Sequence, residues 1–109
     1  MSKISTHVLD AVLGRPAVGI EIRLDAAQDD AWINVAAGVT DADGRCRDLF
    51  QDAAASRYRL TFLTGPYLKS NGRTGIYPEI SFVFDCNGRE PYHLPLLLSD
   101  NSYTTYRGS

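Results

Sequence analysis

The stretch Gly19-Ile20-Glu21-Ile22-Arg23-Leu24-Asp25 decides the fold class. Its apolar residues alternate with charged ones, which is typical of a β-strand that has one buried and one solvated face. The same alternation recurs in residues 58–63 and 80–84, and more weakly in residues 4–13, 32–40, 93–98 and 103–107. Turn-forming residues separate these segments, namely Gly14-Arg15-Pro16, Asp41-Ala42-Asp43-Gly44, Gly65-Pro66, Asn71-Gly72 and Asn87-Gly88. Seven or eight short strands at this spacing predict an all-β, two-sheet antiparallel sandwich.

Only two segments are candidates for a helix. Residues 66–70 could form a single turn, because Gly65 and Asn71-Gly72 bracket them. Residues 49–55 contain good helix formers but suit an irregular connection equally well. With no repeat, low-complexity tract or linker in view, residues 1–109 are predicted to form a single domain with one short helix.

Composition excludes several classes of protein. The 109 residues are 44% hydrophobic and 22% charged, as in a soluble globular domain. A net charge of −2 leaves no basic stripe for a phosphate backbone, so nucleic acid is not an expected partner. The longest apolar run, residues 94–98, is far shorter than the roughly 20 residues of a membrane span. Residues 1–6 lack the features of a secretory signal, so a cytoplasmic location is expected.

Two features that invite a metal or redox interpretation do not support one. Cys46 and Cys86 have no Cys-x-x-Cys spacing and are expected to be unpaired thiols. The string Asp41-Ala42-Asp43-Gly44-Arg45 looks like part of a calcium loop, but the ligand positions of that register fall on Val39 and Phe50. The string is therefore predicted to be a hairpin turn with Gly44 at positive φ, aiming Arg45 from a rigid element.

Two histidines, His7 and His93, lie in predicted strands near opposite ends of the sequence. Taken alone, each is best interpreted as a half-buried residue satisfied by a backbone carbonyl. Residues 103–109 keep an aromatic, strand-like composition where most chain ends are small and polar. This segment is expected to pack against something, such as another subunit, so that its side chains and carboxylate could line a site.

Six segments together carry a family resemblance that covers essentially the whole chain. They are residues 5–10 (STHVLD), 14–17 (GRPA), 40–45 (TDADGR), 78–80 (PEI), 92–99 (YHLPLLLS) and 106–109 (YRGS). The chain resembles the transthyretin-related proteins, and within them the 5-hydroxyisourate hydrolase branch. The final Tyr-Arg-Gly-Ser is the most discriminating piece, because the hormone-carrying transthyretins lack it. Residues 85–89 look short for the family, which affects only a loop.

The resemblance implies a prealbumin-like sandwich that assembles as a homotetramer, a dimer of dimers, with active sites in the channel between dimers. It implies opening of the 5-hydroxyisourate ring by water in urate degradation, giving 2-oxo-4-hydroxy-4-carboxy-5-ureidoimidazoline, with no metal or organic cofactor. Residues 94–98 and 103–106 are the expected interface. The site residues that carry over are His7, Arg45, His93 and Ser109 as catalytic, and Tyr106, Arg107 and Gly108, with His7 and Arg45, as substrate-binding.

These residue types suit the reaction. Hydrolysis of a cyclic acyl–nitrogen bond needs a base for water, a stabiliser for the oxyanion and a proton for the leaving nitrogen. Imidazole, with an ordinary pKa of ~6.5, suits the first and third roles, and the permanently charged guanidinium suits the second. His7 is the leading candidate for the base, His93 for proton shuttle or substrate anchor, and Arg45 for binding the ring carbonyls. The sequence is equally compatible with the two histidines exchanging these roles.

Three other functions compete with this hypothesis. A transthyretin-like carrier would hold a small molecule in its channel without chemistry. A metal-dependent hydrolase could use His7, His93 and a carboxylate such as Asp10, although no local ligand spacing supports it. A purely structural sandwich is the leading interpretation without the resemblance, because a fold alone does not fix a function.

Overall fold

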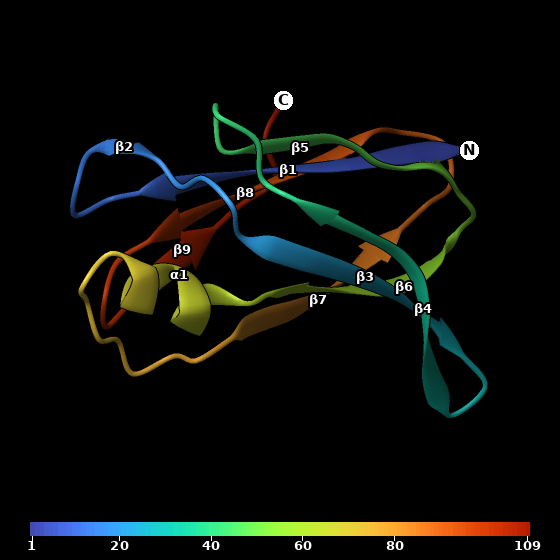
Figure 1. The fold of residues 1–109 in the computed structure, drawn as a ribbon. Coiled ribbons are helices and arrows are strands. Elements are labelled where there is room, and N and C mark those ends of the chain that lie inside the picture. Colours follow the sequence, from blue (N-terminus) through green and yellow to red (C-terminus); the bar gives the residue numbers. More distant parts are fainter.

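The structure is a computed structural model that describes residues 1–109, and it contains nine strands and one helix (Figure 1). The elements are β1 (Ser2–Asp10), β2 (Arg15–Pro16), β3 (Glu21–Gln28), β4 (Ala31–Val39), β5 (Arg45–Ala53), β6 (Ser56–Phe62), α1 (Thr64–Ser70), β7 (Ile80–Cys86), β8 (Tyr92–Leu98) and β9 (Tyr103–Thr105). One sheet has the order β2-β1-β8-β9 with β5 also paired to β1, and the other has the order β4-β3-β6-β7. The predicted all-β sandwich of two sheets with one short helix is confirmed.

One strand pair departs from the antiparallel expectation. β1 and β8 are parallel, in a register that runs from Ile4 opposite Tyr92 to Asp10 opposite Leu98. Every other neighbouring pair of strands in the two sheets is antiparallel. A parallel pair needs a long crossover, and here the whole second sheet and α1 supply it between β1 and β8 (Figure 1). This pairing places residues near opposite ends of the sequence side by side.

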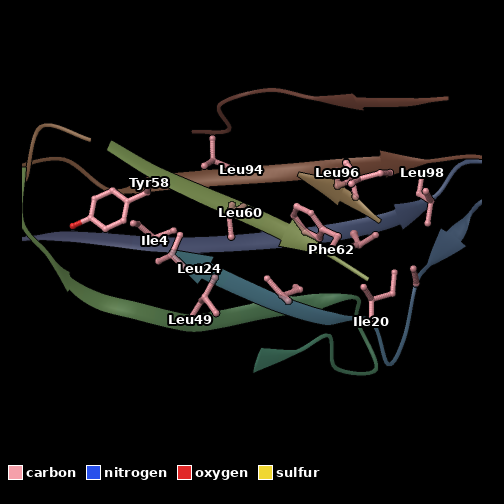
Figure 2. Close-up of a cluster of buried hydrophobic side chains, with 14 of the residues drawn as sticks. Ile4, Ile20, Leu24, Leu49, Tyr58, Leu60, Phe62, Leu94, Leu96 and Leu98 are labelled. Atoms are coloured by element: carbon pink, nitrogen blue, oxygen red, sulfur yellow. The ribbon is translucent and has the colours of Figure 1, made fainter. Parts of the chain in front are cut away.

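The core lies between the two sheets, where 19 buried hydrophobic residues form one cluster (Figure 2). Alternate residues of β3, β6 and β8 supply much of it, as the period of two predicts. On β8 these are Leu94, Leu96 and Leu98, all at most 7% exposed. The apolar run 94–98 is expected to be interface material, but these three leucines fill the core of their own chain. The opposite, outward face of β1 and β8 carries polar side chains together with the half-buried Leu97.

Two helix predictions needed revision. α1 spans seven residues from Thr64, longer than the single turn expected from residue 66, because a proline in the first helical turn is tolerated. Residues 49–55, interpreted as helix or irregular, belong largely to β5, which runs antiparallel to β1. The edge of β1 supplies hydrogen-bond partners, and Leu49 and Ala53 are buried in the core, so packing overrides helix propensity here.

A buried polar cluster fastens α1 and two loops to the end of β1. The Asp10 carboxylate accepts hydrogen bonds from the backbone N–H groups of Val12 and Leu13, which ends the strand earlier than the predicted residue 13. It also accepts from the Tyr67 hydroxyl of α1 at 2.8 Å and from the Arg73 guanidinium, which in turn reaches the Asp100 carboxylate at 2.7 Å. Burial opposes ionisation of Asp10, but these donors together hold its pKa below the usual range.

Burial and the Asp10 carboxylate raise the pKa of Tyr67 to about 12. The hydrogen bond to the same carboxylate raises the pKa of Arg73. Tyr67 therefore stays protonated and Arg73 stays charged at any physiological pH.

The single helix, α1, has neither the length nor the apolar composition that a membrane-spanning helix requires.

Candidate active site

The outward face of the first sheet gathers the predicted site residues through strand register. Ser5 and His7 are two residues apart on β1, so their side chains share that face. The parallel pairing sets Ser5 opposite His93 on β8, and the antiparallel pairing sets His7 opposite Arg45 on β5. Two imidazoles and a guanidinium thus converge from three adjacent strands, and the two imidazole centroids are 6.5 Å apart.

These side chains line a polar cavity of about 540 Å³ on the surface of the sandwich. Its eight lining residues are Ser5, His7, Arg45, His93, Pro95, Tyr106, Gly108 and Ser109. Six of the seven predicted site residues therefore meet around one space. The seventh, Arg107, lines a neighbouring cavity of about 350 Å³, which shares His93, Gly108 and Ser109 with the first.

The turn before β5 positions both Arg45 and His7. The Asp41 carboxylate accepts the backbone N–H groups of Arg45 and Asp43, each at 2.9 Å, and these bonds hold its pKa below the usual range. Gly44 has φ of 74°, as predicted, and a Cβ there would lie 2.4 Å from the Val8 carbonyl oxygen. The turn forms, but the expected hairpin does not: β4 and β5 belong to different sheets, and the turn is a corner between them.

This turn also fixes the proton on His7. The backbone carbonyl oxygen of Asp43 lies 3.0 Å from His7 Nε2. A carbonyl oxygen only accepts, so Nε2 must carry the hydrogen. In the neutral imidazole this leaves the lone pair on Nδ1. Nδ1 of His7 is therefore the atom that can take a proton.

The last residues run back along β8 and close the site. The Gly108 N–H donates to the His93 carbonyl oxygen at 2.7 Å, and the Thr105 hydroxyl donates to the Pro95 carbonyl oxygen at 2.8 Å. A Cβ on Gly108 would lie 2.9 Å from His93 Cδ2, so the tail lies directly against the imidazole. Figure 1 shows the C-terminus beside the loop that leads into β5.

Arg107 holds this tail from the other side. Its guanidinium donates to the Pro91 carbonyl oxygen at 3.0 Å and lies 4.0 Å from the centroid of the Tyr92 ring. It is also 3.8 Å from the Glu90 carboxylate. In this arrangement Arg107 anchors the tail to the start of β8, outside the cavity that holds His7 and Arg45.

The surroundings of His93 disfavour its charged form. Partial burial lowers its pKa, and the positive Arg45 and the neighbouring His7 lower it further. His93 is therefore a neutral imidazole at neutral pH, whereas Arg45 keeps its charge. The cavity combines one fixed positive charge with two imidazoles that can accept or release protons.

Two contributors escaped the sequence reasoning. Ser5 places its Oγ 2.9 Å from His93 Nδ1, and the signal that could have revealed it is its spacing of two residues from His7. Asp41 was expected to be part of a turn, but no role in holding that turn was assigned to it, although an aspartate that opens a tight turn commonly accepts backbone N–H groups two or more residues later. Both signals are present in the sequence, but only the pairing of β1 with β8 shows that the partner of Ser5 is His93.

Other candidate groups stay outside the site. Asp10 is committed to Arg73 and Tyr67 and does not join the histidines. Cys46 turns to the opposite face from Arg45, as the alternation along a strand requires, where its Sγ packs beside Gly38 and burial raises the pKa of its thiol. Cys46 and Cys86 are unpaired, as expected. No group of three or more His, Cys, Asp or Glu side chains converges in the structure.

The two packed sheets and the short helix form a transthyretin-like fold. The outer face of its first sheet carries two histidines and an arginine in one cavity. The chain belongs to the HIUase/transthyretin family, whose model matches residues 4–108. The 5-hydroxyisourate hydrolase of Salmonella dublin is 42% identical over 97% of this chain and 80% of its own length. The solved 5-hydroxyisourate hydrolase of Klebsiella pneumoniae superposes with a TM-score of 0.90 and 34% identity, covering 100% of both chains.

The fold alone does not separate the two branches of this family. The crystal structure of transthyretin from Sparus aurata superposes with a TM-score of 0.93 and 34% identity, over 99% of this chain and 97% of that one. A sandwich of this shape therefore occurs both in a hydrolase and in a transthyretin. The residues in the cavity must decide what this chain does.

Proposed function

We propose that the chain hydrolyses 5-hydroxyisourate to 2-oxo-4-hydroxy-4-carboxy-5-ureidoimidazoline, the step that follows urate oxidation. The observation that carries the proposal is the convergence of His7, Arg45 and His93 around one cavity. The hydrolase names of relatives such as the Salmonella dublin protein support it. The substrate is a small cyclic molecule with several carbonyl oxygens, which suits a polar cavity that contains a guanidinium.

His7 acts as the general base. Its Nδ1 accepts a proton from water as the water oxygen attacks a ring carbonyl carbon, because Nε2–H is committed to the Asp43 carbonyl. The negative charge that develops on the carbonyl oxygen is stabilised by Arg45, which stays charged throughout. The acyl carbon–nitrogen bond then breaks, and the proton that His7 took from water passes through His93 to the leaving nitrogen, so that both imidazoles end neutral, as they began.

The tail shapes the rest of the cavity. Tyr106, Gly108 and Ser109 line it, and the Ser109 hydroxyl is positioned to orient the substrate or the attacking water. Arg107 supports this wall through its contacts with Pro91 and Tyr92. Cys46 lies on the other face of β5, so this mechanism uses water directly and forms no covalent intermediate with a thiol.

The proposal extends to a cytoplasmic homotetramer, a dimer of dimers with its sites in the channel between dimers. In a single chain the cavity lies on the open outer face of one sheet, so a second copy over it would exclude water. The sheets also end in strands with one unpaired edge, β9 on one side and β2 and β5 on the other in the first sheet, and β4 and β7 in the second. Pairing such edges across a two-fold axis is a common way to cover them.

A non-catalytic carrier is the second candidate, favoured by the likeness to the Sparus aurata transthyretin. It would use the same fold to hold a small molecule without bond breaking. The presence of two imidazoles and a guanidinium in the cavity argues for chemistry, since a carrier needs no proton-transfer groups.

One assay distinguishes these functions. 5-Hydroxyisourate is generated from urate with urate oxidase, and its ultraviolet decay is followed with and without the chain, in the presence and absence of a chelator. Accelerated decay unaffected by the chelator supports the proposal, whereas binding without acceleration supports the carrier. Loss of activity with chelator would indicate the metal-dependent alternative.

The His7→Asn variant tests the role of the base. We expect kcat to fall by about 10²-fold or more, with a much smaller change in KM, because positioned acid–base catalysis contributes about 10²–10⁴-fold. Near-normal turnover in this variant would remove His7 from the role of base.

A further inference from the structure

Ser5 is the one polar residue lining the cavity to which the proposed mechanism assigns no role. It lies on β1, on the same face as His7 and directly opposite His93 in the parallel pairing. Its Oγ is 2.9 Å from Nδ1 of His93. We propose that Ser5 is a positioning residue whose hydroxyl accepts the Nδ1–H of His93, so that the ring is held in one tautomer with Nε2 as its proton-exchanging atom. This inference rests on the proposed hydrolase function.

The contacts around the His93 ring support this orientation. The Nδ1 side of the ring meets Ser5, and the Cδ2 side lies against Gly108 of the tail. Two sides of the imidazole are therefore occupied by the protein. The tip of the ring, made of Cε1 and Nε2, remains for the cavity that His93 lines. Turning the ring over would place Cδ2 where Nδ1 lies and so lose the hydrogen bond to Ser5.

A hydroxyl suits the chemistry of a proton shuttle at this place. For Nε2 to gain and lose a proton, Nδ1 must keep its own hydrogen in both states, and a hydroxyl oxygen can accept it in both. A carboxylate in place of Ser5 would favour the imidazolium and raise the pKa of His93. A neutral hydroxyl holds the ring without adding charge beside Arg45.

The two histidines would then present opposite nitrogens to the substrate. His7 donates its Nε2–H to the Asp43 carbonyl and offers Nδ1. His93 donates its Nδ1–H to Ser5 and offers Nε2. The turn before β5 fixes the ring of His7, and the pairing of β1 with β8 fixes the ring of His93. These two contacts determine which nitrogen of each ring exchanges protons.

An isosteric pair of variants tests the inference. Ser5→Thr keeps the hydroxyl, and Ser5→Val replaces it with a methyl group of the same shape; both residues are favoured in strands. The substrate-free proteins are compared by ¹⁵N NMR of the His93 ring nitrogens at neutral pH. The wild type and Ser5→Thr are expected to show a protonated Nδ1 and an unprotonated Nε2, whereas Ser5→Val is expected to show averaged signals from two tautomers. Ser81→Ala on the exposed face of β7 is the matched control for loss of a serine hydroxyl.

Kinetics then connect the tautomer to turnover. In Ser5→Val we expect kcat to fall by about tenfold with KM changed by less than about twofold, and in Ser5→Thr most of kcat to return. Ring-nitrogen signals in Ser5→Val identical to the wild type would overturn the inference, and so would an unchanged kcat. If the wild type itself fails to open 5-hydroxyisourate, the proposed function falls, while the ring-nitrogen comparison still decides whether Ser5 holds His93.

Discussion

The neutral state of His93 has a measurable kinetic consequence. Burial, the Arg45 guanidinium from β5 and His7 from β1 all lower its pKa below the ordinary 6.5. We therefore expect the acidic limb of the kcat/KM profile that belongs to His93 to lie below pH 6.5. Because the unfolded chain binds this proton at a higher pH than the folded chain, stability also falls as the pH drops through 6.5.

NMR titration of His93 in wild type and in Arg45→Gln checks the electrostatic part of this explanation. Removing the guanidinium should move the pKa of His93 back toward its ordinary value. The comparison needs no substrate, so the catalytic role of Arg45 does not interfere. A pKa of His93 that stays unchanged in the variant would show that Arg45 does not act on this ring.

For individual residues, the sequence predicted most of the site residues but not how they are arranged. His7, Arg45, His93 and the tail came from the family resemblance, since a lone histidine on a strand carries no functional signal of its own. Ser5 was not found, because a serine near a histidine is common and only the pairing with β8 gives it a partner. Arg107 was grouped with the substrate-binding residues, whereas its contacts are to Pro91 and Tyr92 beside the cavity.

At the level of elements, the cluster around Asp10 determines how α1 is attached. The Asp10 side chain is 0% exposed and the Arg73 side chain 13%, so the pair is largely removed from water. Replacing Arg73 with Met would leave a buried carboxylate with its cation removed. We expect a loss of about 3–5 kcal/mol in the free energy of unfolding, measured by urea denaturation.

The matched control for this variant is Arg57→Met, which breaks an exposed ion pair with Asp85 on the second sheet. We expect its effect to be within about 1 kcal/mol, because surface ion pairs contribute little. Equal losses in the two variants would contradict the importance of burial at Asp10. Folded Arg73→Met should keep a near-normal KM, because the cluster lies outside the cavity.

Strand prediction succeeded where one face of a strand is buried and the other is wet. Residues 19–25, 58–63 and 80–84 alternate cleanly, and each contributes to a strand of the second sheet. β5 was missed because its sequence, RCRDLFQDA, does not alternate cleanly, and its pairing with β1 contains two register shifts. Its conformation comes from pairing with that edge, which is a tertiary effect that local patterns do not contain.

For the whole molecule, the proposed tetramer is the feature most open to test. The cavity opens on the outer face of the single sandwich, and a neighbouring copy would enclose it. Light scattering in solution should give a mass about four times the 12.0 kDa of one chain. A sharp monomer peak would contradict both the assembly and a site shared between copies.

The parallel pairing of β1 with β8 makes catalysis a reporter of complete folding. His7 and His93 become neighbours only when β8 pairs with β1, a contact of very high sequence separation that is expected to form late in folding. Any intermediate that contains the second sheet but lacks this contact would hold its core in part and have no functional cavity. During refolding, recovery of turnover should therefore lag behind recovery of β-sheet signal, and the interval between them measures the time the polypeptide needs to bring its two halves together.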